Sequence, residues 1–413
     1  MVLPATAPDT DVPDPPAAAP AEAEPPIRLQ DSIGFGARVF AAVWAGWAAL
    51  GLLGTGTFAA QKSVGVPGVD ATPITPGWHN LIVQGNHADA LWYQRIASGG
   101  YRADDPSAAF FPLFPMLARG LGWIGIPAFP ATLLLAQVAF FGALVVMHAL
   151  TRRELGEQNA RRAVRYLAVF PTAFFFLSPF TESLFLLLAL LTFWFARTGR
   201  WWWAAAPALL AGLTRSVGIV LCAALLAEAV QQHLTDRRSS PGTPASAGAL
   251  AARALAVAAP AVGLVIYLSY WQSQGNLTAP MDAQAQWGKV WTLPNETLWH
   301  AAKFAWQYQS YWLLDLLVTA VPLVTVIAGA ALRILRPGYV IYALASLALP
   351  LTAEFASRPL MSVPRYVAVL FPTYWVLAVA VERRRLSGPL VLGISVGGFA
   401  LLGLLFINAY SIF

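Results

Sequence analysis

Charged and thiol side chains are both scarce in this chain of 413 residues. Only 11% of the residues are charged and 58% are hydrophobic, whereas soluble domains carry about 25% charged residues. The single cysteine, Cys222, excludes a disulfide scaffold and a cysteine-based structural zinc site. We therefore expect one integrated membrane unit and not several soluble domains.

Motifs for metals, nucleotides and nucleic acids are also lacking. The five histidines are scattered without a His-x-x-x-His pair, and His79 and His87 stand eight positions apart. A divalent-cation site made by His87 with Asp89 is therefore disfavoured, and we predict neither a metal nor another cofactor. The glycine patterns of phosphate-binding loops are absent, so a soluble nucleotide donor has no evident binding site. The net charge of +6 does not indicate a nucleic-acid partner, because the basic residues lie at the ends of apolar segments.

Long apolar runs occupy most of the chain. Residues 1–33 are acidic and rich in Pro and Ala, cannot bury a core, and are predicted to form a disordered cytoplasmic tail. A bilayer core of about 30 Å requires around 20 apolar residues in a helix. We therefore predict an all-α polytopic membrane protein, with residues 34–413 as a single membrane-embedded unit. Nine segments qualify as spans: 36–60, 129–150, 161–178, 180–197, 251–272, 311–332, 339–353, 366–382 and 389–410.

One further apolar segment, 201–230, is interrupted by Thr214-Arg215-Ser216. If it enters the membrane and returns as two half-helices, seventeen basic residues lie on the side of the N-terminus and eight on the other. Lys and Arg are enriched in cytoplasmic loops, so this count predicts a multi-pass protein of the cell membrane with its N-terminus inside. Arg215 would lie at membrane depth, where a charge usually serves a ligand, a pathway or a partner. The structural alternatives are snorkelling to the inner interface or a salt bridge with Glu182 or Glu228.

Two long segments, 61–128 and 273–310, face outward in this topology and are rich in aromatic residues. Tryptophan favours the headgroup zone, so both are predicted to contain interfacial helices on the outer leaflet. The first contains Asp89, followed by Ala90-Leu91-Trp92-Tyr93. A carboxylate that is partly desolvated among aromatic side chains is a better proton acceptor. Asp89 is therefore a candidate general base, and a helix N-cap or a solvated surface acid is its structural alternative.

Three other features allow a functional and a structural interpretation. Residues 107–115 predict either a kinked interfacial helix or the lining of an acyl-chain groove. Glu182 follows Pro179 closely and suits a helix N-cap, but it could also orient a sugar. Arg365 stands at the start of a predicted span, where it could grip a lipid phosphate or anchor the helix at the interface.

Six motifs in this order resemble the PIG-V family of mannosyltransferases, in its bacterial branch, within the GT-C membrane glycosyltransferases. The resemblance covers about residues 36–385. The motifs are Asp89-Ala90-Leu91-Trp92-Tyr93 with Ile96-Ala97 and Gly100-Tyr101, the run 109–115, Thr181-Glu182-Ser183-Leu184-Phe185, Thr214-Arg215-Ser216-Val217-Gly218-Ile219, Ala285-Gln286-Trp287-Gly288, and Pro364-Arg365-Tyr366 with Leu370-Phe371-Pro372.

The resemblance implies a GT-C-like bundle with an outward active site, a catalytic Asp89, a polyprenyl-phosphate-mannose donor and a lipid-linked or glycan acceptor. His87-Ala88 stand where relatives often carry an aromatic residue, which bears on the placement of the base. The predicted substrate-binding residues are Arg365, Arg215, Glu182, Gln284, Gln286, Trp287, Tyr93 and Arg95. The alternatives are a lipid or solute transporter or flippase without covalent chemistry, and a scaffold subunit of an envelope complex.

Overall fold

The computed structural model describes residues 28–59, 61, 63–239, 245–309 and 311–410. Most of the predicted tail, residues 1–27, therefore lies outside the described residues. Its last residues belong to the fold, because the 3-10 turn η1 (Leu29–Ser32) continues directly into α1 (Ile33–Gly54). Ser32 is fully buried, and its Oγ lies 2.9 Å from Nδ1 of His148. The predicted boundary at residue 33 is therefore several residues too late, since a short polar stretch can extend a packed helix.

The described part of the chain is an all-α polytopic membrane protein. Six of its helical segments are long and apolar enough to cross a bilayer. Five of them match predicted spans, and the sixth is the second arm of the interrupted segment 201–230. The six are Leu29–Gly54, α5 (Ala128–Leu155), Ser216–Ser239, α10 (Ala247–Ser273), Trp312–Ala331 within α13 (Tyr311–Ala331), and α17 (Gly388–Ile407).

The other four predicted spans contain shorter helices. These are α6 (Glu157–Ala168), α7 (Glu182–Arg197), α14 (Pro337–Ala348) and α16 (Pro372–Glu382). Segment 161–178 differs most, because α6 ends at Ala168 and only the 3-10 turn η3 (Ala173–Phe176) follows before α7. Pro171 and Pro179 cannot continue a helix. Non-helical backbone is tolerated at membrane depth only where protein covers it, and most of this stretch is buried.

The interrupted segment forms two helical arms, as predicted, but the second is not a half-helix, because Ser216–Ser239 is long and apolar enough to cross a bilayer by itself. α8 (Trp201–Thr214) ends at Arg215, whose backbone is extended, and the 3-10 turn η4 (Ser216–Ile219) leads into α9 (Val220–Ser239). Trp201 Nε1 donates to Gln232 Oε1 over 3.0 Å. Because Trp201 begins α8 and Gln232 lies in α9, the second arm returns to the level at which the first one starts.

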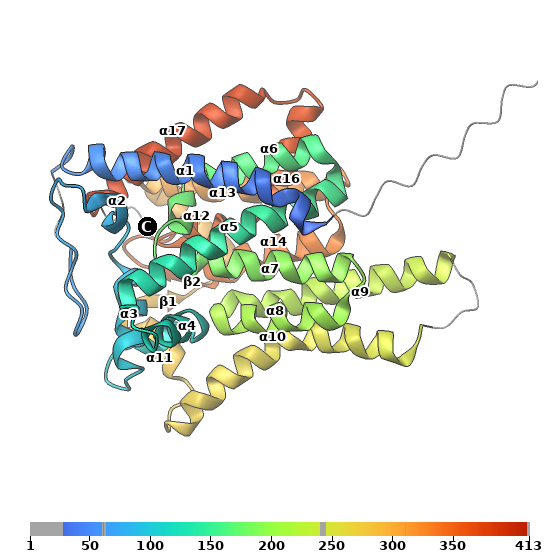
Figure 1. Cartoon of the computed structure of the whole chain (residues 1–413), viewed down its shortest axis with the longest axis horizontal. Helices are drawn as coiled ribbons and strands as arrows, with labels where there is room; N and C mark the ends of the chain where they lie inside the picture. Colours follow the sequence, from blue (N-terminus) through green and yellow to red (C-terminus); the bar gives the residue numbers. More distant parts are fainter. Residues whose placement is uncertain (1–27, 60, 62, 240–244, 310, 411–413) are drawn as a thin grey trace, which may run out of the picture.

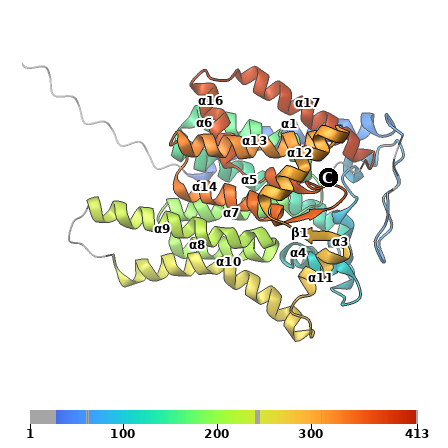
Figure 2. The same ribbon diagram turned by 180° about the vertical axis from the view of Figure 1, so that it is seen from behind.

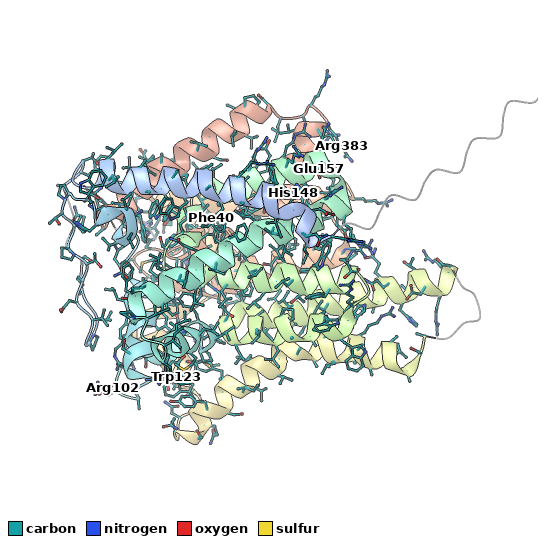
Figure 3. The ribbon with its side chains drawn as sticks, viewed as in Figure 1. Phe40, Arg102, Trp123, His148, Glu157 and Arg383 are labelled. Carbon is teal, nitrogen blue, oxygen red and sulfur yellow. The ribbon has the colours of Figure 1, made fainter. Side chains whose placement is uncertain are left out.

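The long helices run between two ends of the molecule (Figure 1). α2 (Asn80–Val83), α3 (Asp89–Gly99), α4 (Leu113–Gly122) and α11 (Ala279–Gln286) gather at one end, here called the loop end, in both views (Figures 1 and 2). The two predicted interfacial segments therefore lie on the same side of the bundle. Figure 3 shows Trp123 at this end, far from Glu157 and Arg383 at the opposite end.

Exposed tryptophans mark both ends of the bundle. Trp123 and Trp291 are largely exposed at the loop end, and Trp202 and Trp203 are exposed at the start of α8 at the opposite end. Indole side chains favour the two membrane–water interfaces, so their distribution fits a bundle that crosses the bilayer along its long axis.

A short antiparallel sheet links the second interfacial segment to the chain that follows α14. β1 (Lys289–Trp291) pairs with β2 (Ala353–Phe355), with Val290 opposite Glu354. α12 (Pro294–Tyr308) follows β1, and its Thr297 Oγ1 donates to the Leu351 carbonyl. The short helix α15 (Val363–Val367) comes soon after β2, so this sheet helps to fix the position of Arg365.

Candidate active site

Four charged side chains from four separate elements meet towards the loop end. Arg365 Nη1 lies 2.5 Å from Asp89 Oδ2, and its Nε lies 3.2 Å from Glu182 Oε1. Arg215 Nη1 lies 2.5 Å from the same Glu182 oxygen. These residues, here called the Asp89 cluster, form a continuous row of ion pairs from α3 through α15 and α7 to the break between α8 and α9.

Asp89 is the most accessible member of the cluster. Its side chain is 29% exposed, against 11% for Arg365 and 1% for Glu182. It is the first residue of α3, and Ala88 at the preceding cap position has a φ of 53°. Such conformations are sparsely populated for alanine and concentrate at functional sites. Asp89 is thus a first-turn residue and not the N-cap itself, and its carboxylate faces a buried guanidinium.

Both arginines occupy irregular backbone. Arg215 lies in the break after α8, and Arg365 lies in a five-residue helix that follows Ser362 in the left-handed region, with a φ of 69°. The ring of Tyr366 packs against both guanidinium groups, with Cζ-to-centroid distances of 4.5 Å for Arg215 and 5.0 Å for Arg365. The aromatic face stabilises the neighbouring cations, so two positive groups are held on one small surface.

Glu182 holds the two arginines together. It is the first residue of α7 and is fully buried, and its Oε1 accepts from Arg215 Nη1. Its Oε2 has no hydrogen-bond partner within the described chain. Thr181 adds a contact, because its Oγ1 accepts from Arg215 Nη1 over 3.0 Å and lies 3.3 Å from Tyr93 Oη. Of the salt-bridge partners that the sequence leaves open for Arg215, the structure selects Glu182.

An aromatic group extends from the Asp89 cluster to the second interfacial segment. Phe110 stacks on Trp92 at a centroid distance of 5.7 Å, meets Tyr93 edge-on at 5.1 Å and meets Trp287 edge-on at 5.5 Å. Tyr267 of α10 fixes this segment, because its hydroxyl lies 3.0 Å from the Phe110 carbonyl. Burial raises the pKa of Tyr93, so its hydroxyl stays protonated.

Residues 107–115 show the kink that the structural interpretation predicts, and the acyl-chain groove stays a prediction. The 3-10 turn η2 (Pro106–Ala109) precedes Phe110, and α4 begins at Leu113. The segment is therefore a kinked pair of short helices. Its buried Phe110 supplies the centre of the aromatic group described above.

The remaining predicted site residues differ in their surroundings. Gln284 has a buried Oε1 for which the described residues supply no hydrogen-bond partner, whereas Gln286 is exposed. Arg95 is engaged by the loop after α3, since it donates to Asp105 Oδ2 and to the Gly100 carbonyl over 2.7 Å each. The structure therefore places Tyr93 beside the Asp89 cluster through Thr181 and Trp287 further away, against Phe110, and it gives Arg95 separate partners.

Thr181 and Tyr366 contact the arginines of the cluster, but the sequence analysis did not select them as candidate site residues. Each stands next to a selected residue in the same motif, Thr181 before Glu182 and Tyr366 after Arg365. No group of three or more potential metal ligands of the His, Cys, Asp or Glu type occurs among the described residues. Two cavities of about 390 and 560 Å³ are lined by other residues, and Asp89 has the most exposed side chain of the cluster.

No protein-family model matches the chain, and no curated protein matches it. Solved structures give distant likenesses. The chain is similar to an oligosaccharyltransferase from Archaeoglobus fulgidus in complex with Zn and sulfate, at 12% identity and a TM-score of 0.44, over 91% of this chain and 53% of that one. It is also similar to ArnT from Cupriavidus metallidurans bound to undecaprenyl phosphate, at 16% identity and a TM-score of 0.46, over 90% and 63%. The chain thus spans less than two thirds of the length of either protein.

Proposed function

We propose that this protein is a GT-C-type membrane glycosyltransferase that moves a mannosyl residue from a polyprenyl-phosphate donor to an acceptor hydroxyl on the outer membrane face. The observation that carries the proposal is the Asp89–Arg365 pair, in which a partly exposed carboxylate contacts a buried guanidinium. The ordered motifs shared with the PIG-V family support the choice of mannose and of a lipid-phosphate donor.

The charges of the cluster suit a lipid phosphodiester. Arg215, Arg365 and Glu182 together carry one net positive charge, which matches the single negative charge of a sugar-phosphate-lipid linkage. Arg365 exchanges Asp89 for the donor phosphate, because both anions compete for the same fork of N–H donors. Donor binding thereby frees the Asp89 carboxylate beside the reacting sugar.

The reaction is a single displacement. Asp89 takes the proton of the acceptor hydroxyl, the acceptor oxygen forms a bond to the anomeric carbon, and the bond from that carbon to the phosphate oxygen breaks with its electron pair on the phosphate. One displacement inverts the anomeric configuration, so a β-linked donor gives an α-mannoside. The negative charge that leaves Asp89 appears on the phosphate, where Arg365 and Arg215 stabilise it as fixed donors.

The aromatic group gives the sugar a surface. Trp92 and Trp287 flank the buried ring of Phe110, which also meets Tyr93 beside the cluster. Aromatic faces suit the C–H faces of a hexose. The unpartnered Oε1 of Gln284 supplies an acceptor for a sugar hydroxyl, since a buried polar atom gains most when it is paired. Glu182 acts by positioning the two arginines.

A transporter or flippase without covalent chemistry remains the second candidate. The observation that favours it is a further buried charge group at the opposite end of α7, around Glu228, because a transport path requires polar groups on both sides. The members of that group contact one another through Arg197, which bridges Glu154 and Glu228. A scaffold role is a third possibility and predicts that Asp89 is dispensable.

Transfer in proteoliposomes tests the proposal. Purified protein is given radiolabelled polyprenyl-phosphate-mannose with membrane acceptors, and bare lipid translocation is measured in parallel. We expect labelled product from the wild type and a loss of about 10²–10⁴-fold for Asp89→Asn, the usual contribution of a general base. Asp104→Asn is the matched control, because Asp104 is an exposed carboxylate of the same loop.

Two results would overturn the assignment. If a folded Asp89→Asn protein transferred mannose at nearly the wild-type rate, Asp89 would not be the general base. If the wild type translocated lipid without transferring any sugar, the transporter would be favoured. A glucosyl donor that outperforms the mannosyl donor would leave the reaction class intact but correct the sugar.

A further inference from the structure

A second cavity, at the opposite end from Asp89, has no place in the transfer reaction. It measures about 560 Å³ and lies between α9, the end of α13 and the start of α14. Its polar lining is Gln231, Arg333 and Arg336, and its apolar lining includes Leu335, Val340 and Ile341. Cavities of about 300–1,000 Å³ are the usual size for small-molecule and cofactor sites. We call it the α13–α14 cavity.

The cavity lies where the membrane-crossing helix α13 ends. The span Trp312–Ala331 finishes at its edge, and Gln231 belongs to the other lining span, Ser216–Ser239. Gln231 lies eight residues before the end of its span and begins the polar run Gln231-Gln232-His233. The cavity is therefore where the apolar parts of both spans end, at the depth of lipid headgroups. Its polar side therefore meets the headgroup zone, while Val340 and Ile341 follow along α14 towards the bilayer core.

The cavity has an uncompensated positive charge. Arg333 is exposed and forms no ion pair within the described part of the chain. Arg336 has one ionic contact, with its Nε 3.5 Å from Glu228 Oε2, and this buried Nε has no hydrogen-bond acceptor in the described residues. Because Glu228 compensates the charge of Arg336, the charge of Arg333 gives the cavity one net positive charge. The Nε of Arg336 is in addition a donor without an acceptor in the described residues.

The local backbone holds Arg333 at the cavity. The chain turns sharply after α13, with the amides of Ile334 and Leu335 both donating to the Gly329 carbonyl, and Arg333 has a φ of 53°. α14 then starts at Pro337 directly after Arg336. The positive end of its helix dipole adds to the field of the two arginines.

We propose that the α13–α14 cavity binds one anionic phospholipid of the surrounding leaflet. The phosphodiester lies between Arg333 and Arg336, and an acyl chain follows Leu335, Val340 and Ile341. A lipid with one net negative charge matches the charge of the cavity, whereas a zwitterionic lipid brings a second cation next to Arg333. Basic pockets between transmembrane helices bind acidic headgroups in this way. The proposal does not depend on the transfer reaction.

The test compares lipids on the full-length protein in detergent. Thermal unfolding and native mass spectrometry are measured with phosphatidylglycerol, with phosphatidylcholine and with inorganic phosphate. We expect phosphatidylglycerol to bind at least about tenfold more tightly than phosphatidylcholine, since charge-assisted hydrogen bonds are the strong ones, and phosphate alone to raise the Tm little. Equal binding of the two lipids, or an equal effect of phosphate, would overturn the proposal.

Three variants locate the binding. Arg333→Asn removes the charge and keeps a residue that tolerates a positive φ, and it should lower phosphatidylglycerol affinity about tenfold. Ile341→Trp fills the apolar part and should also weaken binding, although the arginines are intact. Arg238→Gln changes an exposed arginine of α9 outside the cavity and should have no effect. Unchanged affinity in both Arg333→Asn and Ile341→Trp would refute the assignment.

Discussion

The two ends of α7 carry two buried charge groups of the same composition. The helix begins with Glu182, which belongs to the Asp89 cluster, and ends with Arg197. Arg197 pairs with Glu154 and Glu228, and Arg336 contacts Glu228. These last four residues, here called the Glu228 cluster, contain two carboxylates and two arginines, as the Asp89 cluster does. Composition alone therefore does not distinguish a reactive site from a structural one.

The backbone distinguishes the two groups. Three members of the Glu228 cluster, Glu154, Arg197 and Glu228, lie on the continuous helices α5, α7 and α9, and only Arg336 lies in the turn before α14. In the Asp89 cluster, by contrast, Arg215 lies in a helix break and Arg365 lies in a five-residue helix. Continuous helices fix a charge by many backbone bonds, whereas breaks and short helices allow a side chain to change partners when a ligand arrives.

Pairing and exposure distinguish them as well. Arg197 contacts Glu154 through Nε at 2.6 Å and Glu228 through Nη1 at 2.8 Å, and Gln232 donates to the same Glu228 oxygen. Asp89 is 29% exposed and has a single ionic partner, Arg365, among the described contacts. Glu182 and Glu228 are both buried between two arginines, so the two groups differ at Asp89, the open and singly paired carboxylate on which the proposed reaction rests.

The largest expected effect is on stability, at the Glu228 cluster. Glu228→Gln leaves Arg197 and Arg336 without their shared carboxylate, and breaking a buried pair costs about 3–5 kcal/mol. The folded protein should still transfer sugar at the wild-type rate per molecule. Unfolding in detergent and turnover corrected for folded protein check this, with Asp104→Asn, at a largely exposed carboxylate, as control; lost turnover without lost stability would place Glu228 in the reaction.

The next largest effect is on catalysis, at the Asp89 cluster. Arg365→Ala removes the proposed donor to the leaving phosphate and should lower kcat about 10²–10³-fold. The donor requirement should rise more than the acceptor requirement. Arg336→Ala is the matched change in the other cluster and should leave turnover nearly unchanged. Equal increases in the donor and acceptor KM values would mean that Arg365 only anchors its helix.

A smaller effect is expected at the aromatic group. Trp287→Leu removes the ring that meets Phe110 and should raise the acceptor or donor KM about tenfold, the order expected for a lost aromatic contact. Trp291→Leu, four residues further along the chain, changes a largely exposed ring and serves as control. If both variants behave alike, the aromatic group does not bind the sugar.

The smallest effect is a pH dependence of stability near Asp89. Burial lowers the pKa of His87 from 6.5 to about 4, and its ring packs edge-on against Phe406 at a centroid distance of 4.4 Å. The unfolded chain therefore binds a proton that the folded chain does not, so stability falls as the pH drops from 6.5 towards 4, by about 0.8 kcal/mol at pH 6. His87→Leu should remove this slope, and exposed His79→Asn should keep it; parallel curves for the wild type and His87→Leu would contradict the prediction.

The candidate site was predictable as a set of residues but not as a geometry. Asp89, Glu182, Arg215 and Arg365 stand out in the sequence because charges are rare in apolar surroundings. The sequence does not indicate that Arg365 pairs with Asp89, 276 positions away, nor whether Glu182 or Glu228 pairs with Arg215. The sequence likewise does not indicate that Arg95 pairs with Asp105, a loop carboxylate ten positions further along the chain.

The hydrophobic pattern by itself determined where the long helices lie, because the bilayer requires continuous apolar runs with satisfied backbone bonds. It also determined the break at Arg215, where an ion interrupts such a run. It did not distinguish a lipid-facing helix from the buried, irregular stretch after α6, since both are equally apolar. Only the tertiary structure decided which charges meet, because ion pairing depends on distances between elements that the order of residues does not specify.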